Sequence, residues 1–393
     1  MNLPEPLRPQ VDRLQKQALI AGIAGLVLCA IFGFRDSSQF FRSYLFSYIF
    51  WVSIPLGCIG ILMLHHLTGG WWGYPLRRLL EAGTRTLVFM ALLYVPLWFG
   101  LSALYPWMKA GWVPDDSLHH FKLVYLSHTF FMARTVIYFV LLLLIVYLLN
   151  RWSGEQDRTA DNRLAERLTK LSGIGVVIWG LVVSAAAFDW VMSLEPNWFS
   201  TIYGFIFIDL ETLVALSFIL FMLRRLSVCP PLKECIRPAD YNDLGNLMLA
   251  FLLLWAYLSF SQFLLIWSGN LKDEIPYYMV RAFGGWGGVA VLLIIFHFFV
   301  PFFCLLMRPM KRSLNRLSGI AAYMIVLTLV DVYWQVVPAF MVAGPRIHWL
   351  DIFAVLGLGG LWLAAFLHQL GKRPLLPLHD PRFEGVLVNE HGD

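Results

Sequence analysis

The chain has 393 residues, of which 59% are hydrophobic and only 14% charged, and its formal net charge is +5. Soluble domains have about a quarter of their residues charged, so this composition excludes an ordinary soluble protein and indicates an integral membrane protein. The basic residues are spread over many loops rather than gathered on one soluble face, which argues against nucleic acid as a partner.

Ten apolar stretches follow one another along the chain, and each is long enough to cross the roughly 30 Å of bilayer hydrocarbon as a helix. They predict an all-α polytopic membrane protein with a short N-terminal segment at 1–17, a membrane domain at 18–370 and a polar, loosely ordered tail at 371–393. The predicted spans are 18–34, 43–66, 84–106, 126–149, 171–192, 200–223, 243–268, 283–307, 317–343 and 350–370.

The basic residues are distributed unequally between the two sides of these spans. Of the 30 Lys and Arg, 22 fall on the side of the N-terminus, seven fall on the opposite side, and Arg134 alone lies inside a span. Loops rich in Lys and Arg face the cytoplasm. We therefore expect both termini in the cytoplasm.

Several spans contain ionisable or polar side chains, which are expensive in hydrocarbon and usually mark a path for protons, ions or a redox-active ligand. At 1.5 Å per residue, most of them fall in the non-cytoplasmic half of spans 4–9. We expect Arg134 to pair with Asp209 or Glu211 at the centre of a buried polar network. The candidate residues are His128, Arg134, Asp189, Asp209, Glu211, Gln262, His297 and Asp331, with Gln335 nearby.

Three interpretations of this set remain open. The side chains can form a structural network that fixes helix packing. They can conduct protons from the middle of the membrane to the non-cytoplasmic side. They can also line a quinone pocket, in which a carboxylate or histidine accepts a quinol proton and aromatic rings flank the quinone ring. The last two interpretations are compatible, because quinol oxidation releases protons.

The sequence lacks the pattern of a haem or iron–sulfur site. A b-type haem requires two facing histidines at similar depth, whereas His128 and His297 differ by about 15 Å of helix rise. The five cysteines form no C-x-x-C motif. We therefore expect this chain alone to bind neither cofactor, and we expect His65, His66 and His368 to be polar residues at the cytoplasmic interface.

Glycines gather at the start of the eighth span. Gly284 and Gly288 have the small-xxx-small spacing that permits close helix contact, which is the first expectation for this segment. The alternative is a broken helix start beside a ligand.

A series of short motifs resembles one family, the ActF-type membrane subunit of alternative complex III in the NrfD/PsrC-like superfamily. The similarity runs from about residue 60 to 340. Its motifs are HHLTGG (65–70) with Trp72, LSHTFFMAR (126–134), FDWVMSLEP (188–196), STIYG (200–204), DLGN (243–246), WAY (255–257), SFSQFL (259–264) and IWSGNL (266–271).

The resemblance implies two four-helix bundles, spans 2–5 and 6–9, with spans 1 and 10 peripheral. It implies a subunit of a quinol:electron-acceptor oxidoreductase in a bacterial inner membrane that supports quinol oxidation, complex assembly and proton translocation. The partners would be a second NrfD-like subunit, an iron–sulfur subunit and c-type haem subunits. The resemblance places the working quinol site in the second NrfD-like subunit and implies a scaffold and a proton path for this one. It leaves open whether menaquinone or another quinone also binds in this chain.

A secondary transporter that uses the buried carboxylates for ion coupling is the alternative function. Ten spans and acidic residues at mid-membrane depth would suit it. The sequence shows no inverted repeat with matching broken helices in both halves, which argues against it.

Overall fold

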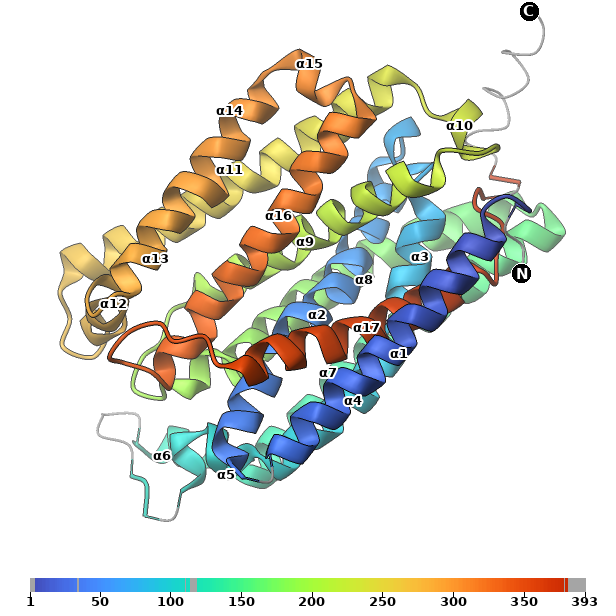
Figure 1. Ribbon diagram of the computed structural model, residues 1–393. Coiled ribbons are helices and arrows are strands. Elements are labelled where there is room, and N and C mark those ends of the chain that lie inside the picture. The colour runs from blue at the N-terminus through green and yellow to red at the C-terminus, as the bar shows by residue number, and fades with distance from the viewer. Residues whose placement is uncertain (1–3, 34, 110, 114–118, 378, 381–393) are drawn as a thin grey trace, which may run out of the picture.

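The computed structural model describes residues 4–377, 379 and 380, apart from residues 34, 110 and 114–118. The protein is 82% helical, and no β-strand occurs among the described residues. In this part of the chain ten helices are long and apolar enough to cross a membrane, which confirms the predicted all-α polytopic fold (Figure 1).

On the side of the molecule where the two termini lie, two of the helices extend beyond the predicted spans. The first helix begins at Arg8 rather than at residue 18, and the fourth spanning helix ends at Thr159 rather than at residue 149. The spanning helices are α1 (Arg8–Gly33), α2 (Ser37–Thr68), α3 with α4 (Arg77–Arg85, Leu87–Phe99), α7 (His128–Thr159), α8 (Asn162–Trp190), α9 (Tyr203–Leu226), α11 (Pro238–Gly269), α13 with η4 and α14 (Trp286–Leu292, Leu293–Phe299, Val300–Leu306), α16 (Leu314–Val336) and α17 (Trp349–Leu370).

Short helices and single turns connect the spans. The short helices are α5 (Leu101–Leu104), α6 (His119–Tyr125), α10 (Leu232–Cys235), α12 (Ile275–Ala282) and α15 (Arg308–Lys311). The single turns are η1 (Trp71–Gly73), η2 (Pro106–Met108), η3 (Met192–Leu194) and η5 (Val337–Ala339).

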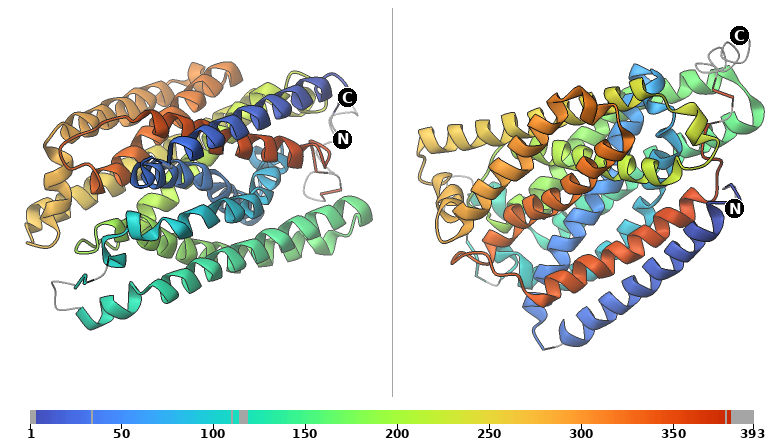
Figure 2. Two further views of the ribbon diagram at one scale, coloured as in Figure 1. Left: turned by 60° about the horizontal axis from the view of Figure 1, so that its bottom comes forward. Right: turned by 45° about the horizontal axis from the view of Figure 1, so that its top comes forward.

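The helices form two bundles that share a long contact. The first bundle consists of α2, α3–α4, α7 and α8, and the second of α9, α11, α13–η4–α14 and α16 (Figure 2). Helices α2 and α9 pack against each other and so join the bundles. Because each also contacts the rest of its own bundle, these two helices are almost wholly buried, whereas the outer helices keep an exposed apolar face.

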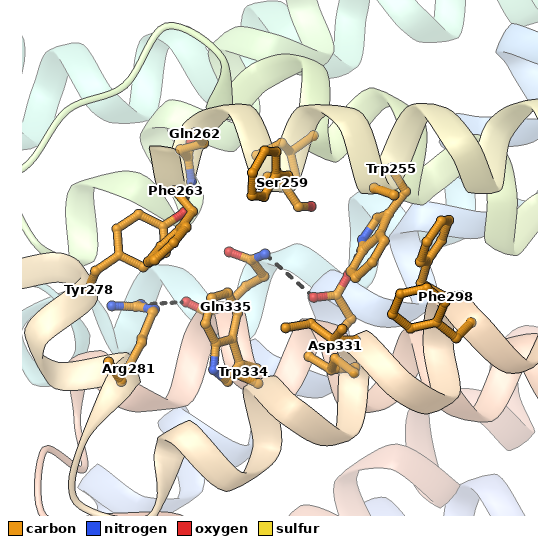
Figure 3. Close-up of a pocket in the computed structure, with 18 residues that line it drawn as sticks. Trp255, Ser259, Gln262, Phe263, Tyr278, Arg281, Phe298, Asp331, Trp334 and Gln335 are labelled. Atoms are coloured by element: carbon orange, nitrogen blue, oxygen red, sulfur yellow. Dashed lines mark hydrogen bonds between the residues drawn. The ribbon is translucent and has the colours of Figure 1, made fainter. Parts of the chain in front are cut away.

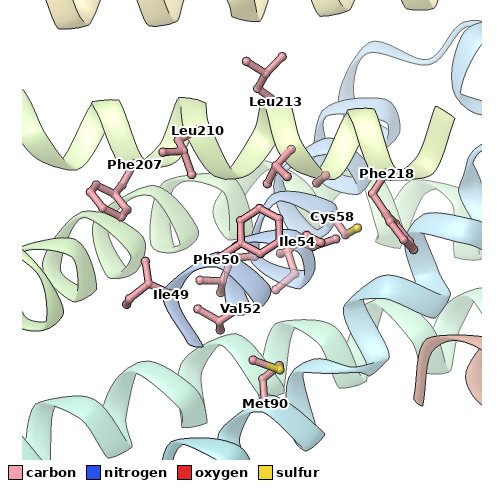
Figure 4. Packing of buried hydrophobic residues seen from close by; sticks show 14 of the residues in the cluster. Ile49, Phe50, Val52, Ile54, Cys58, Met90, Phe207, Leu210, Leu213 and Phe218 are labelled. Carbon is pink, nitrogen blue, oxygen red and sulfur yellow. The ribbon is translucent and has the colours of Figure 1, made fainter. Parts of the chain in front are cut away.

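The contact between α2 and α9 is the core of the protein. Ile49 and Val52 of α2 lie beside Phe207 and Leu210 of α9, and all four are buried (Figure 4). The backbones approach most closely at Gly57, where a Cβ atom would lie 1.9 Å from the carbonyl oxygen of Glu211. Only glycine fits at this crossing.

Helices α1 and α17 pair along the edge of the molecule, and α17 also contacts α2. Glycines allow the close approach, because a Cβ atom on Gly25 would lie 2.8 Å from the Cα of Gly357 and one on Gly360 would lie 2.5 Å from the carbonyl oxygen of Ala18. Small residues at a helix crossing are a common device in membrane proteins. The first and last spans are therefore peripheral, as predicted.

The prediction of a loosely ordered tail is wrong for its described part. Residues 371–377, 379 and 380 fold back against α3, where Arg77 donates to Asp380 at 2.5 Å and Arg373 donates to Glu81 at 3.0 Å. Glu81 also accepts from Arg77 and Arg78. Of the five residues in this ionic cluster, Arg77, Arg78, Glu81 and Asp380 are buried and Arg373 is partly exposed. Residues 381–393 lie outside the described residues.

Candidate functional site

A cavity of about 590 Å³ lies in the second bundle, between α11, α16 and the interrupted segment α12–α13–η4 (Figure 3). Its wall is mostly apolar, with a few polar side chains that converge on the interior. The aromatic lining residues are Trp255, Phe260, Phe263, Tyr278, Phe298, Phe299 and Trp334, and the polar ones are Ser259, Gln262, Arg281, Asp331 and Gln335. Pockets of this size and composition are typical of small-molecule sites.

Helical periodicity places these residues on the cavity side. On α11, Trp255, Ser259 and Gln262 are separated by four and three residues, so they share one face of the helix. On α16, Asp331 and Gln335 are four residues apart and face them across the cavity. Two helices from distant parts of the sequence thus supply opposite polar walls.

The rim of the cavity is open toward the surroundings of the protein at membrane depth. Phe260, Ile294 and Phe299 line the cavity and are 62%, 52% and 44% exposed. They lie on spanning helices, so in a bilayer this rim faces hydrocarbon. An apolar ligand can therefore enter from the lipid without crossing water.

The helix beside the cavity is interrupted at two places. Gly284 and Gly285 have φ angles of +61° and +93°, which end α12 and start α13 in a new direction. Farther along, residues Leu293–Phe299 form a π-helix, an arrangement frequent at functional sites. The expected packing role of Gly288 is wrong, because nothing lies within 4 Å of the place its Cβ would occupy. The structure instead has the alternative that the sequence left open, a broken helix start beside the cavity.

Asp331 is the buried carboxylate of the cavity. It is 1% exposed, and its Oδ2 accepts a hydrogen bond of 2.8 Å from the indole nitrogen of Trp255. The amide of Gln335 approaches the other oxygen at 3.5 Å. No basic side chain neutralises this carboxylate among the described residues.

Tyr278 and Gln262 form the polar wall nearer the end opposite the termini. The amide of Gln262 donates to the Tyr278 hydroxyl at 3.3 Å, and its oxygen accepts from Ser200 at 2.9 Å. Burial raises the pKa of Tyr278 to about 12, so its hydroxyl stays protonated at neutral pH and can donate to a ligand.

Arg281 is a fully buried cation at the same end of the cavity. Its guanidinium lies 3.5 Å from the ring centroid of Tyr277 and donates to Glu195 at 2.8 Å and to the backbone oxygen of Gln335 at 3.1 Å. The Tyr277 hydroxyl donates to the Gln335 side chain at 3.0 Å. These contacts tie α12 to α16 and to the connection between the bundles.

The predicted partner of Arg134 is wrong. Arg134 forms a two-fold hydrogen-bonded ion pair with Asp189, at 2.8 and 2.9 Å, within the first bundle. Tyr138 donates to the same carboxylate at 2.7 Å, and Arg134 also donates to the backbone oxygen of Tyr125. Helix α8 rather than α9 is the neighbour of α7 at this face, so Asp189 meets the arginine.

Asp209 and Glu211 are buried. Among the described residues, neither carboxylate oxygen of Asp209 has a hydrogen-bond partner, nor does Oε2 of Glu211. Asp209 lies close enough to Asp331 to interact with it electrostatically, on the side of α9 that packs against α16. Glu211 borders a void of about 10 Å³ between the bundles, about the space of one water molecule. Uncompensated carboxyl groups at this depth are candidates for holding protons.

Four of the histidines lie in three different settings. His128 is exposed and so lies outside the buried network in which it was predicted. His297 is buried in the π-helix, next to the cavity, with its ring 4.4 Å from that of Trp255 and its Nε2 3.5 Å from the Thr328 hydroxyl. His65 and His66, in the last turn of α2, are buried within the protein, because η1 and α8 cover them.

Of the predicted residues, Gln262 and Asp331 line the cavity. His297 and Asp209 do not line it but neighbour lining residues, His297 next to Trp255 and Asp209 near Asp331. The sequence did not reveal the contributions of Trp255, Tyr278 and Arg281. The four-residue spacing of Trp255 and Ser259 was a usable signal. Arg281 was counted only as a loop residue, because α12 is too short for a span.

No protein-family model and no curated protein matches this chain.

Proposed function

We propose that this chain is an integral membrane subunit of a quinol:electron-acceptor oxidoreductase, of the alternative complex III type, in a bacterial inner membrane. The cavity of the second bundle would be its quinol site. The observation that carries the proposal is the combination of a lipid-facing aromatic rim with a buried carboxylate in the wall of the cavity.

The residues present fit a quinol such as menaquinol. A volume of about 590 Å³ accommodates a one- or two-ring headgroup, and the exposed rim at Phe260 and Phe299 leaves room for an isoprenoid tail to extend into lipid. The interior offers Asp331 as an acceptor and the Tyr278 hydroxyl as a donor. A headgroup with oxygens on opposite sides of its ring requires such a pair.

When bound, quinol supplies two electrons and two protons. Asp331 is positioned to accept a proton, and the indole of Trp255 stabilises the resulting arrangement by holding the carboxyl group in place. Asp209, which interacts with Asp331, and Glu211 between the bundles are the groups of this chain that would carry protons in a translocation path. The electrons would pass to iron–sulfur and c-type haem subunits, with a second NrfD-like subunit beside this chain.

Photoaffinity labelling tests the proposal. An azido-naphthoquinone added to native membranes should label peptides of α11, η4 and α16, and an excess of quinol should prevent it. Ala256→Trp fills the cavity and should reduce both labelling and quinol oxidation at least about tenfold, as expected for loss of a bound headgroup.

Ala250→Trp is the matched control, because it places the same side chain on the exposed face of the same helix. Labelling elsewhere, or equal labelling of both variants, would refute the assignment of the site. Extraction in mild detergent of the chain alone, without haem-bearing partners, would instead favour a secondary transporter.

A further inference from the structure

The connection between α14 and α16, which contains the short helix α15, carries basic residues at the side of the termini (Figure 1). No Asp or Glu occurs between residues 274 and 331, so no acidic residue of this part of the sequence offsets their charge. Helix α9 ends beside the connection, where Arg224 donates to the side-chain oxygen of Asn315. Four arginines form this basic cluster: Arg224, Arg308, Arg312 and Arg316.

The arginines of the basic cluster lie at the surface of the protein. The three in the connection are exposed, and Arg224 is half-buried. Arg316 donates to the backbone oxygen of Pro309 at 3.5 Å, and none of the four forms an ion pair with a described residue. Lys311, between them in the sequence, is buried and donates to the neutral side chain of Asn246 at 2.6 Å.

The first bundle uses its cations differently at the same side of the molecule. There Arg77 and Arg78 are buried and pair with Glu81, Asp157 and Asp380 inside the protein. Those arginines hold the fold together. The basic cluster of the second bundle has no such counter-charge within the described part of the chain, so its charge is available to a partner from outside.

An exposed apolar strip continues from the basic cluster along α14. Leu306 and Met307, next to Arg308, are 50% and 46% exposed, and Phe303 is 58% exposed. The ring of Phe303 stacks on that of Phe299, with centroids 6.3 Å apart, and Phe299 lines the rim of the cavity. At 1.5 Å per residue the strip is about 14 Å long, close to half of the roughly 30 Å of bilayer hydrocarbon.

We propose that the basic cluster binds the phosphate of an anionic phospholipid, such as phosphatidylglycerol, whose acyl chains lie on α14 and end beside the cavity rim. Guanidinium groups bind phosphate through charge-assisted hydrogen bonds, and basic clusters at the ends of spanning helices attract anionic headgroups. A soluble anion would match the charge of the cluster but would leave the apolar strip unused. The proposal is independent of what the cavity binds.

The test uses a phosphatidylglycerol with a photoactivatable diazirine at the end of one acyl chain. Added to the purified complex in nanodiscs of phosphatidylcholine, it should label peptides of η4 and α14. Unlabelled phosphatidylglycerol should prevent the labelling, whereas the same amount of phosphatidylcholine or of inorganic phosphate should not.

Two triple variants separate the basic cluster from the general charge of this side of the protein. Replacing three arginines of the cluster should reduce the labelling at least about tenfold, because it removes three contacts to the phosphate. The control removes three exposed arginines from the same side, between α7 and α8 and on α8, and should label like the parent. The first variant is Arg308→Gln, Arg312→Gln, Arg316→Gln, and the control is Arg158→Gln, Arg163→Gln, Arg167→Gln.

Equal labelling of the two triple variants would overturn the proposal, because the lipid would then be attracted by net charge and not held by the basic cluster. Labelling of the parent outside η4 and α14–α16 would also overturn it. Prevention of the labelling by inorganic phosphate would show a site for a soluble anion instead of a lipid. The peptide mapping and the competition in the parent decide the question even where a variant fails to assemble.

Discussion

Replacing Arg134 by methionine should destabilise the protein strongly. The change removes both hydrogen bonds of the guanidinium to Asp189, whose side chain is fully buried, and leaves that carboxylate with the neutral Tyr138 hydroxyl as a donor. Loss of one partner of a buried ion pair costs about 3–5 kcal/mol, because the other charge stays buried without compensation. We expect a loss of that size in the free energy of unfolding.

The assay is unfolding of the purified complex in mixed micelles by titration with SDS. The double variant Arg134→Met, Asp189→Leu should recover much of the loss, since it removes both charges. It leaves the Tyr138 hydroxyl without its partner, at a cost of about 1–3 kcal/mol. Lys170→Met is the control. It breaks an ion pair on the exposed surface and should leave the unfolding curve unchanged.

Additive effects of the two substitutions on stability would refute this reasoning. If the double variant loses as much stability as the two single variants together, to within about 0.5 kcal/mol, then the two residues do not interact. A normal unfolding curve for Arg134→Met would show that the guanidinium and the carboxylate are not paired in the membrane.

Three further predictions concern the core, the buried carboxylates and the orientation. Gly57→Val should abolish the folded complex, because its Cβ would lie 1.9 Å from a backbone oxygen of α9. Gly173→Val is the control and should be tolerated, because its Cβ would meet only a leucine methyl at 3.8 Å. Gel filtration measures the yield of the two variants. Asp209→Asn and Glu211→Gln should both assemble, since neither carboxylate pairs with an arginine of the described residues. At least one of them should reduce proton translocation by proteoliposomes, and two fully active variants would exclude the proton path. A reporter that is active only outside the cytoplasm should give no signal when fused after Asp393, and a strong signal would reverse the predicted orientation.

The sequence could predict the spans because crossing a bilayer depends on local composition. Each apolar stretch had the length of a membrane helix, and all ten occur in the structure in the predicted order. Hydropathy predicted the helix ends less well, because α1 and α7 continue as helices into polar sequence on the side of the termini. Backbone hydrogen bonding propagates a helix past the apolar boundary.

The arrangement of the polar side chains depended on tertiary structure. Depth along the membrane made Asp209 and Glu211 plausible partners for Arg134, but depth specifies neither the rotation of a helix nor its neighbour, and Asp189 proved to face the arginine. The same holds for the described part of the tail, where Asp380 pairs with Arg77 of α3, a contact between residues about 300 positions apart.

The sequence by itself determined that this is a ten-span membrane protein and that Asp331 and Gln262 lie buried within it. Only the tertiary structure decided that these two residues share a cavity with Trp255 and Arg281. Burial of a span in hydrocarbon is a property of each segment alone. A cavity forms where the faces of several distant helices meet. Its wall is also shaped by residues with positive φ angles and by a π-helix, and neither feature can be read from hydropathy.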